Sequence, residues 1–207
     1  PYAAKRPPID SHYFETFNKG HVTLVDVQTD PIAEITSNGI ALEGGAHHEL
    51  DVIVFATGYD AMTGPLLNLN IETSKASLKS YWKVGPRNYL GLAIPGFPNL
   101  FTITGPGSPS VLSNMPVSIE QHVDWITECI AYCIKTGCTS IEAQEQSAEI
   151  LTDHVRETAD ATLLPKVQHS WYLGANIPGK PRVFMPYAGG LNTYRKVCNN
   201  IAKKGYK

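Results

Sequence analysis

The chain has 207 residues, of which 43% are hydrophobic and 17% charged, and its formal net charge is −2. These values are typical of one globular domain or a large piece of one. A net charge this small gives no basic field for nucleic acid or an anionic membrane, and the longest apolar runs are too short to span a bilayer.

The first 20 residues predict an extended entry followed by a short helix over residues 11–18, with Ser11 as its N-cap. The run that begins at Pro1 has no initiator methionine and reads like the middle of a longer protein.

Residues 21–60 predict a β-meander that leads into a buried strand. Short apolar stretches at 22–27, 32–35 and 39–43 are separated by glycine-containing turns. The run from Val52 to Phe55 is continuously apolar and ends in Ala-Thr-Gly, which predicts a strand covered on both faces with a small-residue turn at its end. An ordinary core strand with a glycine turn is the alternative.

A second strand end of this kind is predicted further along the chain. Residues 61–95 are irregular, and residues 98–104 predict a short buried strand that runs into Gly105-Pro-Gly107. Ligands gather at the carboxyl ends of strands in open α/β sheets. The N–H groups of a following helix suit a phosphate or the electron-rich edge of a reduced flavin. Chain reversal alone is the alternative for both turns.

Helical periodicity dominates the rest of the chain. It predicts helices over 118–136, closed by Gly137, over 145–164 and over 191–203, with a loop-rich segment at 165–190. The cysteines form no Cys-x-x-Cys pair and the histidines have no zinc spacing, so we expect free thiols in a cytoplasmic protein and no metal site.

No Gly-x-Gly-x-x-Gly fingerprint occurs in the chain. A dinucleotide-binding protein carries that fingerprint at its first strand–helix turn. Either the chain binds no dinucleotide, or the fingerprint lies upstream of Pro1.

Four motifs in order give the chain a family resemblance, supported by a matching helix start at 118–122. The motifs span residues 5–10, 55–59, 105–110 and 171–182. Together they resemble the C-terminal part of Baeyer–Villiger monooxygenases of the phenylacetone, cyclohexanone and steroid monooxygenase type.

The resemblance implies a two-domain α/β flavoprotein more than twice this length, with a Rossmann-like, three-layer fold. FAD, NADPH and O₂ would convert a ketone to an ester or lactone through a C4a-peroxyflavin. Residues 1–20 would end the NADP-binding domain or form a linker, and residues 21–207 would be the C-terminal part of the FAD-binding domain. Both fingerprints of the family lie in the N-terminal half, which would be a covalent or associated partner of this chain.

The resemblance also assigns cofactor roles to three residues. Arg6 matches the catalytic arginine, whose permanent charge stabilises the anionic peroxyflavin and which also touches the nicotinamide. Lys5 matches a lysine that contacts the 2′-phosphate of NADP, and Trp171 matches a tryptophan whose indole N–H donates to NADP. The alternatives are solvated charges for Arg6 and Lys5, and a buried core residue for Trp171.

A substrate pocket is implied next to the second glycine turn. Ser110, Val111 and Leu112 match the loop that shapes ketone selectivity. Met115 matches a residue whose backbone meets the flavin and whose side chain lines the pocket, although a gap-filling core methionine is the alternative.

The remaining motif residues receive weaker assignments. Thr57, Gly58 and Tyr59 would pack against the FAD-binding domain, and Asp60 is interpreted as a turn carboxylate without chemistry. Lys180 and Arg182 would close over the cofactor or be exposed charges, with exposure favoured for Arg182.

Two other functions stay open from the sequence. The chain could lack activity alone, as a remnant or as a subunit whose partner carries the FAD fingerprints. It could also belong to a sulfide- or N-oxidising flavin monooxygenase. His122 and Asp124 lie two apart on a helix, so they do not face each other and predict no catalytic pair.

Overall fold

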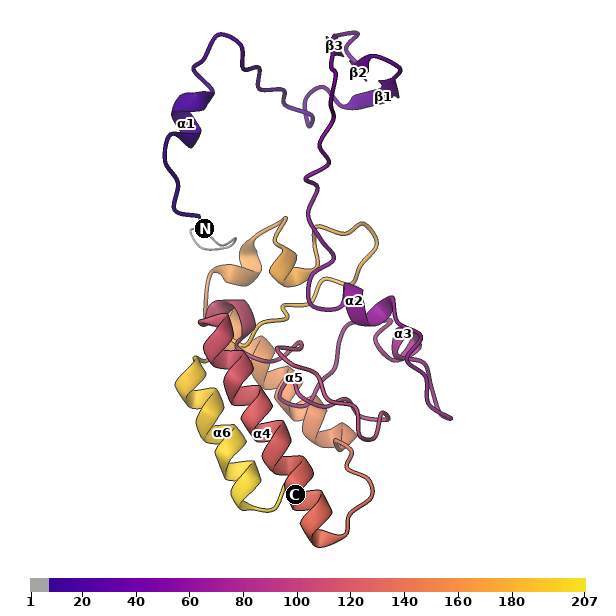
Figure 1. The fold of residues 1–207 in the computed structure, drawn as a ribbon, viewed down its shortest axis with the longest axis vertical. Coiled ribbons are helices and arrows are strands. Elements are labelled where there is room, and N and C mark those ends of the chain that lie inside the picture. Colours follow the sequence, from indigo (N-terminus) through magenta and orange to yellow (C-terminus); the bar gives the residue numbers. More distant parts are fainter. Residues whose placement is uncertain (1–7) are drawn as a thin grey trace. The chain divides into compact units, whose positions relative to one another are not determined.

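The computed structural model describes residues 8–207, so Lys5 and Arg6 lie outside the described residues. The described chain divides into a smaller compact unit, residues 8–58, and a larger one, residues 59–207. Figure 1 shows the elements of both units along the chain.

The smaller unit contains one short helix and a three-stranded antiparallel sheet. The helix is α1 (Tyr13–Thr16), and the strands β1 (Ile32–Thr36), β2 (Gly39–Leu42) and β3 (His47–Glu49) are ordered β1-β2-β3. Ile35 pairs with Ile40 in the β1–β2 hairpin. The predicted β-meander is therefore confirmed for its second and third stretches, whereas residues 22–27 form no strand.

The buried strand predicted at residues 52–56 is absent from the described structure. Residues 52–60 carry no strand, and the exposed fractions of Val52, Val54 and Phe55 are 74%, 81% and 72%. A strand needs a neighbour for its backbone hydrogen bonds. No segment within residues 8–207 pairs with this run, so it forms no strand in the described structure.

Helix α1 is shorter than predicted and is capped by different residues. His12, not Ser11, occupies the N-cap position, in a left-handed conformation with φ 68°. The carboxylate Oδ1 of Asp10 accepts a hydrogen bond from the backbone N–H of Tyr13 at 3.0 Å.

Three long helices form the frame of the larger unit: α4 (Met115–Thr136), α5 (Glu145–Asp160) and α6 (Leu191–Lys203). Helix α4 starts three residues before the predicted Ser118, because Asn114 caps it by accepting from the Val117 N–H at 3.4 Å. Gly137 ends α4 at φ 74°, as predicted. Helix α6 has the predicted bounds, and α5 ends four residues early. Helices α4 and α6 pack side by side (Figure 1).

Short helices connect this frame. They are α2 (Gly64–Leu67), α3 (Leu78–Tyr81), η1 (Ser110–Leu112), η2 (Leu164–Lys166) and η3 (Trp171–Leu173).

The predicted strand at residues 98–104 is reduced to one bridge between Phe101 and Ala93. Asn99 and Thr104 have φ values of 61° and 53°, in the left-handed region. Residues in that region interrupt an extended strand.

Three apolar clusters form the core of the larger unit. The largest joins α4, α5 and α6 and buries Leu90, Leu92, Trp125, Cys129, Val155, Tyr187, Tyr194 and Cys198. Its polar atoms are paired: the Trp125 indole donates to the Cys198 carbonyl at 3.0 Å, and the Tyr194 hydroxyl donates to the Leu90 carbonyl at 2.7 Å. A second cluster centres on Trp82, and a third on Tyr172 and Phe184.

All four cysteines are free thiols. None of the helices within residues 8–207 is both long enough and apolar enough to cross a membrane.

Candidate functional site

The second glycine turn is joined by backbone hydrogen bonds to the segment that follows the Trp171 motif. The Gly107 N–H donates to the Met185 carbonyl, and the Tyr187 N–H donates to the Ser108 carbonyl, both at 2.7 Å. Two segments almost 80 residues apart in the sequence, at 107–108 and 185–187, therefore meet in the larger unit.

The Trp171 motif itself forms a closed loop. The Val183 N–H donates to the Leu173 carbonyl at 3.1 Å, and the Met185 N–H donates to the Tyr172 carbonyl at 2.9 Å. Gly174 reverses the chain with φ 68°, a conformation that glycine adopts without strain. Residues 174–182 thus project from a hydrogen-bonded base.

The tip of this loop is attached to the end of the Ala-Thr-Gly motif. The Asn176 side-chain amide donates to the Tyr59 carbonyl at 3.0 Å. Lys180 forms an ion pair with Asp60, and their side chains are only 11% and 33% exposed. Nothing in the sequence pairs them, since its pattern predicts a turn carboxylate for Asp60 and a cofactor contact or an exposed charge for Lys180.

Arg182 is exposed, as expected from the sequence, but its guanidinium is engaged. It donates to the carbonyl oxygens of Gln168 at 2.7 Å and Pro165 at 3.2 Å, and also to that of Val167. The side chain therefore ties down residues 165–168.

Two of the four predicted pocket residues and the predicted NADP-binding tryptophan pack against one apolar cluster. Val111, Leu112 and Trp171 all pack against the buried group of Ala159, Tyr172, Leu173 and Phe184. The Trp171 ring meets Tyr172 edge-on, with centroids 4.6 Å apart. Within residues 8–207, no hydrogen-bond acceptor contacts the Trp171 indole N–H. Trp171 is half-buried and packs against the core cluster, so both its role toward NADP and the alternative of a core tryptophan stay open.

Ser110 and Met115 lie on the turn that leads into α4. Ser110 is buried and left-handed at φ 44°, which strains a residue with a side chain. The Ser113 hydroxyl donates to the Ser110 carbonyl at 2.8 Å and lies 2.6 Å from the Ser118 hydroxyl. Half-buried Met115 is the first residue of α4, where backbone N–H groups lack intrahelical partners.

These features fit the two cofactors that the sequence resemblance implies. The backbone N–H of Met115, at the first position of α4, suits the electron-rich edge of a flavin. An indole N–H without an acceptor suits a donor role toward NADP. Thr57, Gly58 and Tyr59 are all exposed, and their packing against a FAD-binding domain stays a prediction.

Sequence reasoning missed a buried histidine behind the glycine turn. His122 is fully buried on α4, and its Nδ1 accepts from the Thr104 N–H at 2.9 Å. Burial lowers the pKa of His122 to about 4, so the ring is neutral near pH 7. Asp124 is exposed on the same helix, which agrees with the prediction that the two do not form a pair. The helix-start motif marked this position, but only the fold supplies the Thr104 contact.

A cavity of about 460 Å³ lies between α5 and residues 182–187. It shares Leu173 and Phe184 with the cluster around Trp171. None of the four residues expected to line the ketone pocket, Ser110, Val111, Leu112 and Met115, lines this cavity. We therefore place the candidate site at the cluster and the start of α4, where those four residues lie.

Comparison with known proteins finds that the chain is similar, along nearly its whole length, to parts of known monooxygenases. It is 42% identical to cyclohexanone 1,2-monooxygenase of Acinetobacter sp. over 205 residues, and 42% identical to a Baeyer–Villiger monooxygenase of Pseudooceanicola batsensis over 204 residues. These matches cover 99% and 98% of this chain but 37% of each relative. A phenazine N-monooxygenase of Lysobacter antibioticus is 40% identical, with 99% and 37% covered. No family model matches the chain.

Solved structures agree in fold as well as in sequence. Oxidized steroid monooxygenase bound to NADP superposes with a TM-score of 0.86 and 47% identity, covering 99% of this chain and 38% of that one. OTEMO in complex with FAD and NADP gives a TM-score of 0.92 and 34% identity, covering 100% and 38%.

The chain is thus a homologue of flavin- and NADP-binding monooxygenases along nearly its whole length. More narrowly, it corresponds to a portion of the Baeyer–Villiger monooxygenases, and it spans about 37% of the length of the curated relatives it matches. The resemblance that its motifs predicted is confirmed, and the coverage is consistent with a C-terminal portion.

Proposed function

We propose that this chain is part of a Baeyer–Villiger monooxygenase that converts ketones to esters or lactones with NADPH and O₂. The observation that carries the proposal is the convergence of Val111, Leu112 and Trp171 on one apolar cluster. The cluster lies in a chain 42% identical to a cyclohexanone 1,2-monooxygenase. An apolar wall suits the carbon skeleton of a ketone.

FAD and NADP are the proposed cofactors, because a homologous structure is a complex with both. When bound, the flavin supplies the oxygen-activating chemistry. Met115 would present its backbone N–H to the flavin at the start of α4, and the Trp171 indole would donate to NADP. Val111 and Leu112 would exclude water and orient the ketone.

Arg6 would be the catalytic cation and Lys5 the ligand of the NADP 2′-phosphate, as their motif implies. In the complete protein, Arg6→Ala should abolish ester formation while reduction of the flavin by NADPH survives. Lys5→Ala should weaken binding of NADPH much more than binding of NADH, because only NADPH carries the phosphate. Ester formation near the wild-type rate in Arg6→Ala would remove that assignment.

The remainder of the relatives' length is the proposed partner of this chain. Residues 1–20 would end the NADP-binding domain, and residues 21–207 would complete a three-layer, Rossmann-like FAD-binding domain. The exposed run from Val52 to Phe55 supports this, because it has the sequence of a covered strand and no pairing partner within residues 8–207. Its partner strands would come from the N-terminal half. The free thiols favour a reducing compartment, which we propose is the cytoplasm.

The test is turnover of the complete protein with a cyclic ketone, an aryl ketone and a sulfide, with NADPH and O₂ present. Formation of a lactone or ester is the expected result. If no ketone yields either product, the proposed function is wrong. The 207-residue chain alone should bind FAD poorly, because it has no phosphate-binding glycine fingerprint. A flavin absorption spectrum from that chain alone would contradict this second point.

N-oxidation is the second candidate, because a phenazine N-monooxygenase is 40% identical over nearly the whole chain. The same assay separates the two functions if phenazine is added as a substrate. An N-oxide without any ester or lactone would favour the second candidate.

A further inference from the structure

The ion pair between Asp60 and Lys180 is built into the larger unit rather than formed by chance at its surface. The side chains are 33% and 11% exposed. Glycines stand against both partners: a Cβ at Gly64 would lie 2.7 Å from the Asp60 Cβ, and a Cβ at Gly174 would lie 3.1 Å from the Lys180 Cδ. Removal of Asp60 would leave the Lys180 ammonium, on a side chain that is only 11% exposed, without a compensating charge.

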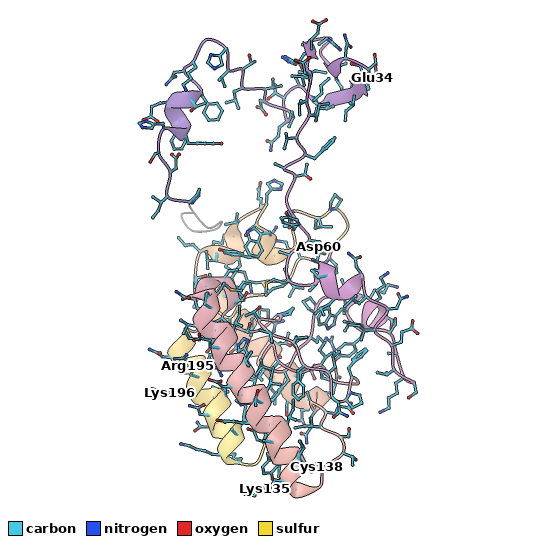
Figure 2. All side chains as sticks on the ribbon, in the orientation of Figure 1. Glu34, Asp60, Lys135, Cys138, Arg195 and Lys196 are labelled. Carbon is cyan, nitrogen blue, oxygen red and sulfur yellow. The ribbon has the colours of Figure 1, made fainter. Side chains whose placement is uncertain are left out.

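The pair attaches one particular segment. Lys180 lies near the tip of the loop whose base is closed between Leu173 and Val183. Asn176 forms the second attachment, through its bond to the Tyr59 carbonyl. Asp60, labelled in Figure 2, forms the ion pair with the Lys180 ammonium of this loop. The tip is therefore tied to residues 59–60 at two points, at Asn176 and at Lys180.

Trp171 lies two residues before the base of this loop, and the segment 171–182 contains both Trp171 and the projecting residues 174–182. The Gly174 N–H donates to the Trp171 carbonyl at 3.1 Å, and the Ile177 N–H donates to the Gly174 carbonyl at 3.2 Å. The Lys180 N–H in turn donates to the Ile177 carbonyl at 3.3 Å. A chain of short turns thus links Lys180 to Trp171, so a tip that is free to move loosens the segment that orients the indole.

We propose that Asp60 and Lys180 are positioning residues, which hold the 171–182 loop so that the Trp171 indole N–H is presented to NADP. The inference rests on the proposed function for the identity of the ligand. Neither residue needs to touch the cofactor. They act by raising the fraction of molecules in which the loop has the NADP-binding conformation. If that fraction falls, the apparent affinity for NADP falls by the same factor.

The first measurement is hydrogen–deuterium exchange of the 171–182 amides in the complete protein. Asp60→Asn and Lys180→Met remove one charge each with little change in size. Both should speed exchange in this loop, and the double variant should be no faster than the singles, because the pair acts as one unit. Lys180→Arg keeps the charge and should restore slow exchange. Lys79→Met removes an exposed lysine on α3 and is the matched control.

The second measurement separates positioning from a general structural role. The KM for NADPH should rise about tenfold in Asp60→Asn and Lys180→Met, whereas kcat at saturating NADPH should stay within about twofold of wild type. Thermal unfolding of each variant is recorded alongside. A merely structural role would lower kcat and the unfolding temperature together and leave the KM for NADPH in place.

Two results would overturn the inference: wild-type exchange of the loop in both single variants, or faster exchange with an unchanged KM for NADPH. If the increases in exchange rate from the two single variants add up in the double variant, Asp60 and Lys180 do not act as a pair. A wild-type protein that does not use NADPH would instead refute the proposed function, and the exchange rates would still decide whether the pair holds the loop.

Discussion

Similar apolar sequences are buried in the larger unit of this chain and exposed in the smaller one. In the larger unit, apolar residues from distant segments form three clusters, and Leu92 and Ile94 are fully buried. In the smaller unit, Leu42 is the one buried large hydrophobic residue within residues 8–58, while Val54 and Phe55 are largely exposed. The contrast shows that an apolar run predicts burial only where the chain also supplies a covering surface.

The sharpest test of this contrast is truncation of one residue from each unit. Leu92→Ala should destabilise the 207-residue chain by about 2–5 kcal/mol, because it opens a cavity in a packed core. Phe55→Ala should change the free energy of unfolding by less than about 0.5 kcal/mol in the same chain, because the ring is exposed. Urea unfolding measures both.

The same two substitutions should behave differently in the complete protein. If a partner half covers residues 52–55, Phe55→Ala should there cost several kcal/mol, as is usual for a buried aromatic ring. An equally small effect in both proteins would mean that the buried-strand interpretation of this run is wrong.

Sequence reasoning predicted the fold where local signals are sufficient. The spacing of α6 gave its bounds, and Gly137 marked the end of α4 through its left-handed conformation. It failed where a strand forms only if a second strand pairs with it. Residues 22–27 and 52–56 have strand-like sequences but no neighbouring strand in the described chain. It also failed at 98–104, where Asn99 and Thr104 have positive φ values and form hydrogen bonds to the distant residues Ile141 and His122.

Two left-handed glycines offer a second comparison between the units. Gly91, in the larger unit, has φ 69°, and a Cβ there would lie 2.6 Å from the Gly105 carbonyl oxygen and 2.8 Å from the Ser108 backbone nitrogen. Gly45, in the smaller unit, has φ 89° and open space around it. Gly91→Ala should cost about 2–4 kcal/mol, from backbone strain plus overpacking, and Gly45→Ala about 1 kcal/mol from strain alone. Equal losses in urea unfolding would show that the larger unit is not the more tightly packed one.

The buried His122 predicts how the larger unit responds to acid. Its pKa is about 4 in the folded chain, below the usual histidine value of 6.5, because burial disfavours the charged ring. As pH falls below 6.5, the unfolded chain binds a proton that the folded chain does not, so stability declines until pH 4. The loss between pH 7.5 and pH 5 should be about 2 kcal/mol.

His122→Asn is the matched variant, because its side-chain oxygen can still accept from the Thr104 N–H. Its free energy of unfolding should be lower than wild type at pH 7.5, and this difference should shrink by about 2 kcal/mol at pH 5. A variant that keeps the wild-type pH dependence would assign the acid sensitivity to other groups.

The candidate site was only half predictable. The motifs located Trp171, Val111 and Leu112, but their convergence on Tyr172 and Phe184 depends on long-range packing. The pairing of Asp60 with Lys180 joins residues 120 positions apart, and neither has a sequence context that names the other. Contacts of this kind are set by the path of the whole chain.

The reactivity of the four cysteines measures directly how well the core of the larger unit is shielded from solvent. Cys129 and Cys198 are fully buried, and burial raises their pKa values to about 12 and about 11, whereas Cys138 is exposed. A thiol must be both accessible and ionised to react. In the native 207-residue chain, iodoacetamide should therefore modify Cys138 first and Cys133 more slowly, and Cys129 and Cys198 only after unfolding in urea. Mass spectrometry of the alkylated peptides follows the four rates. If Cys129 reacts as fast as Cys138 without denaturant, the core around Trp125 opens in the isolated chain, and the larger unit then needs a covering partner as much as the smaller unit does.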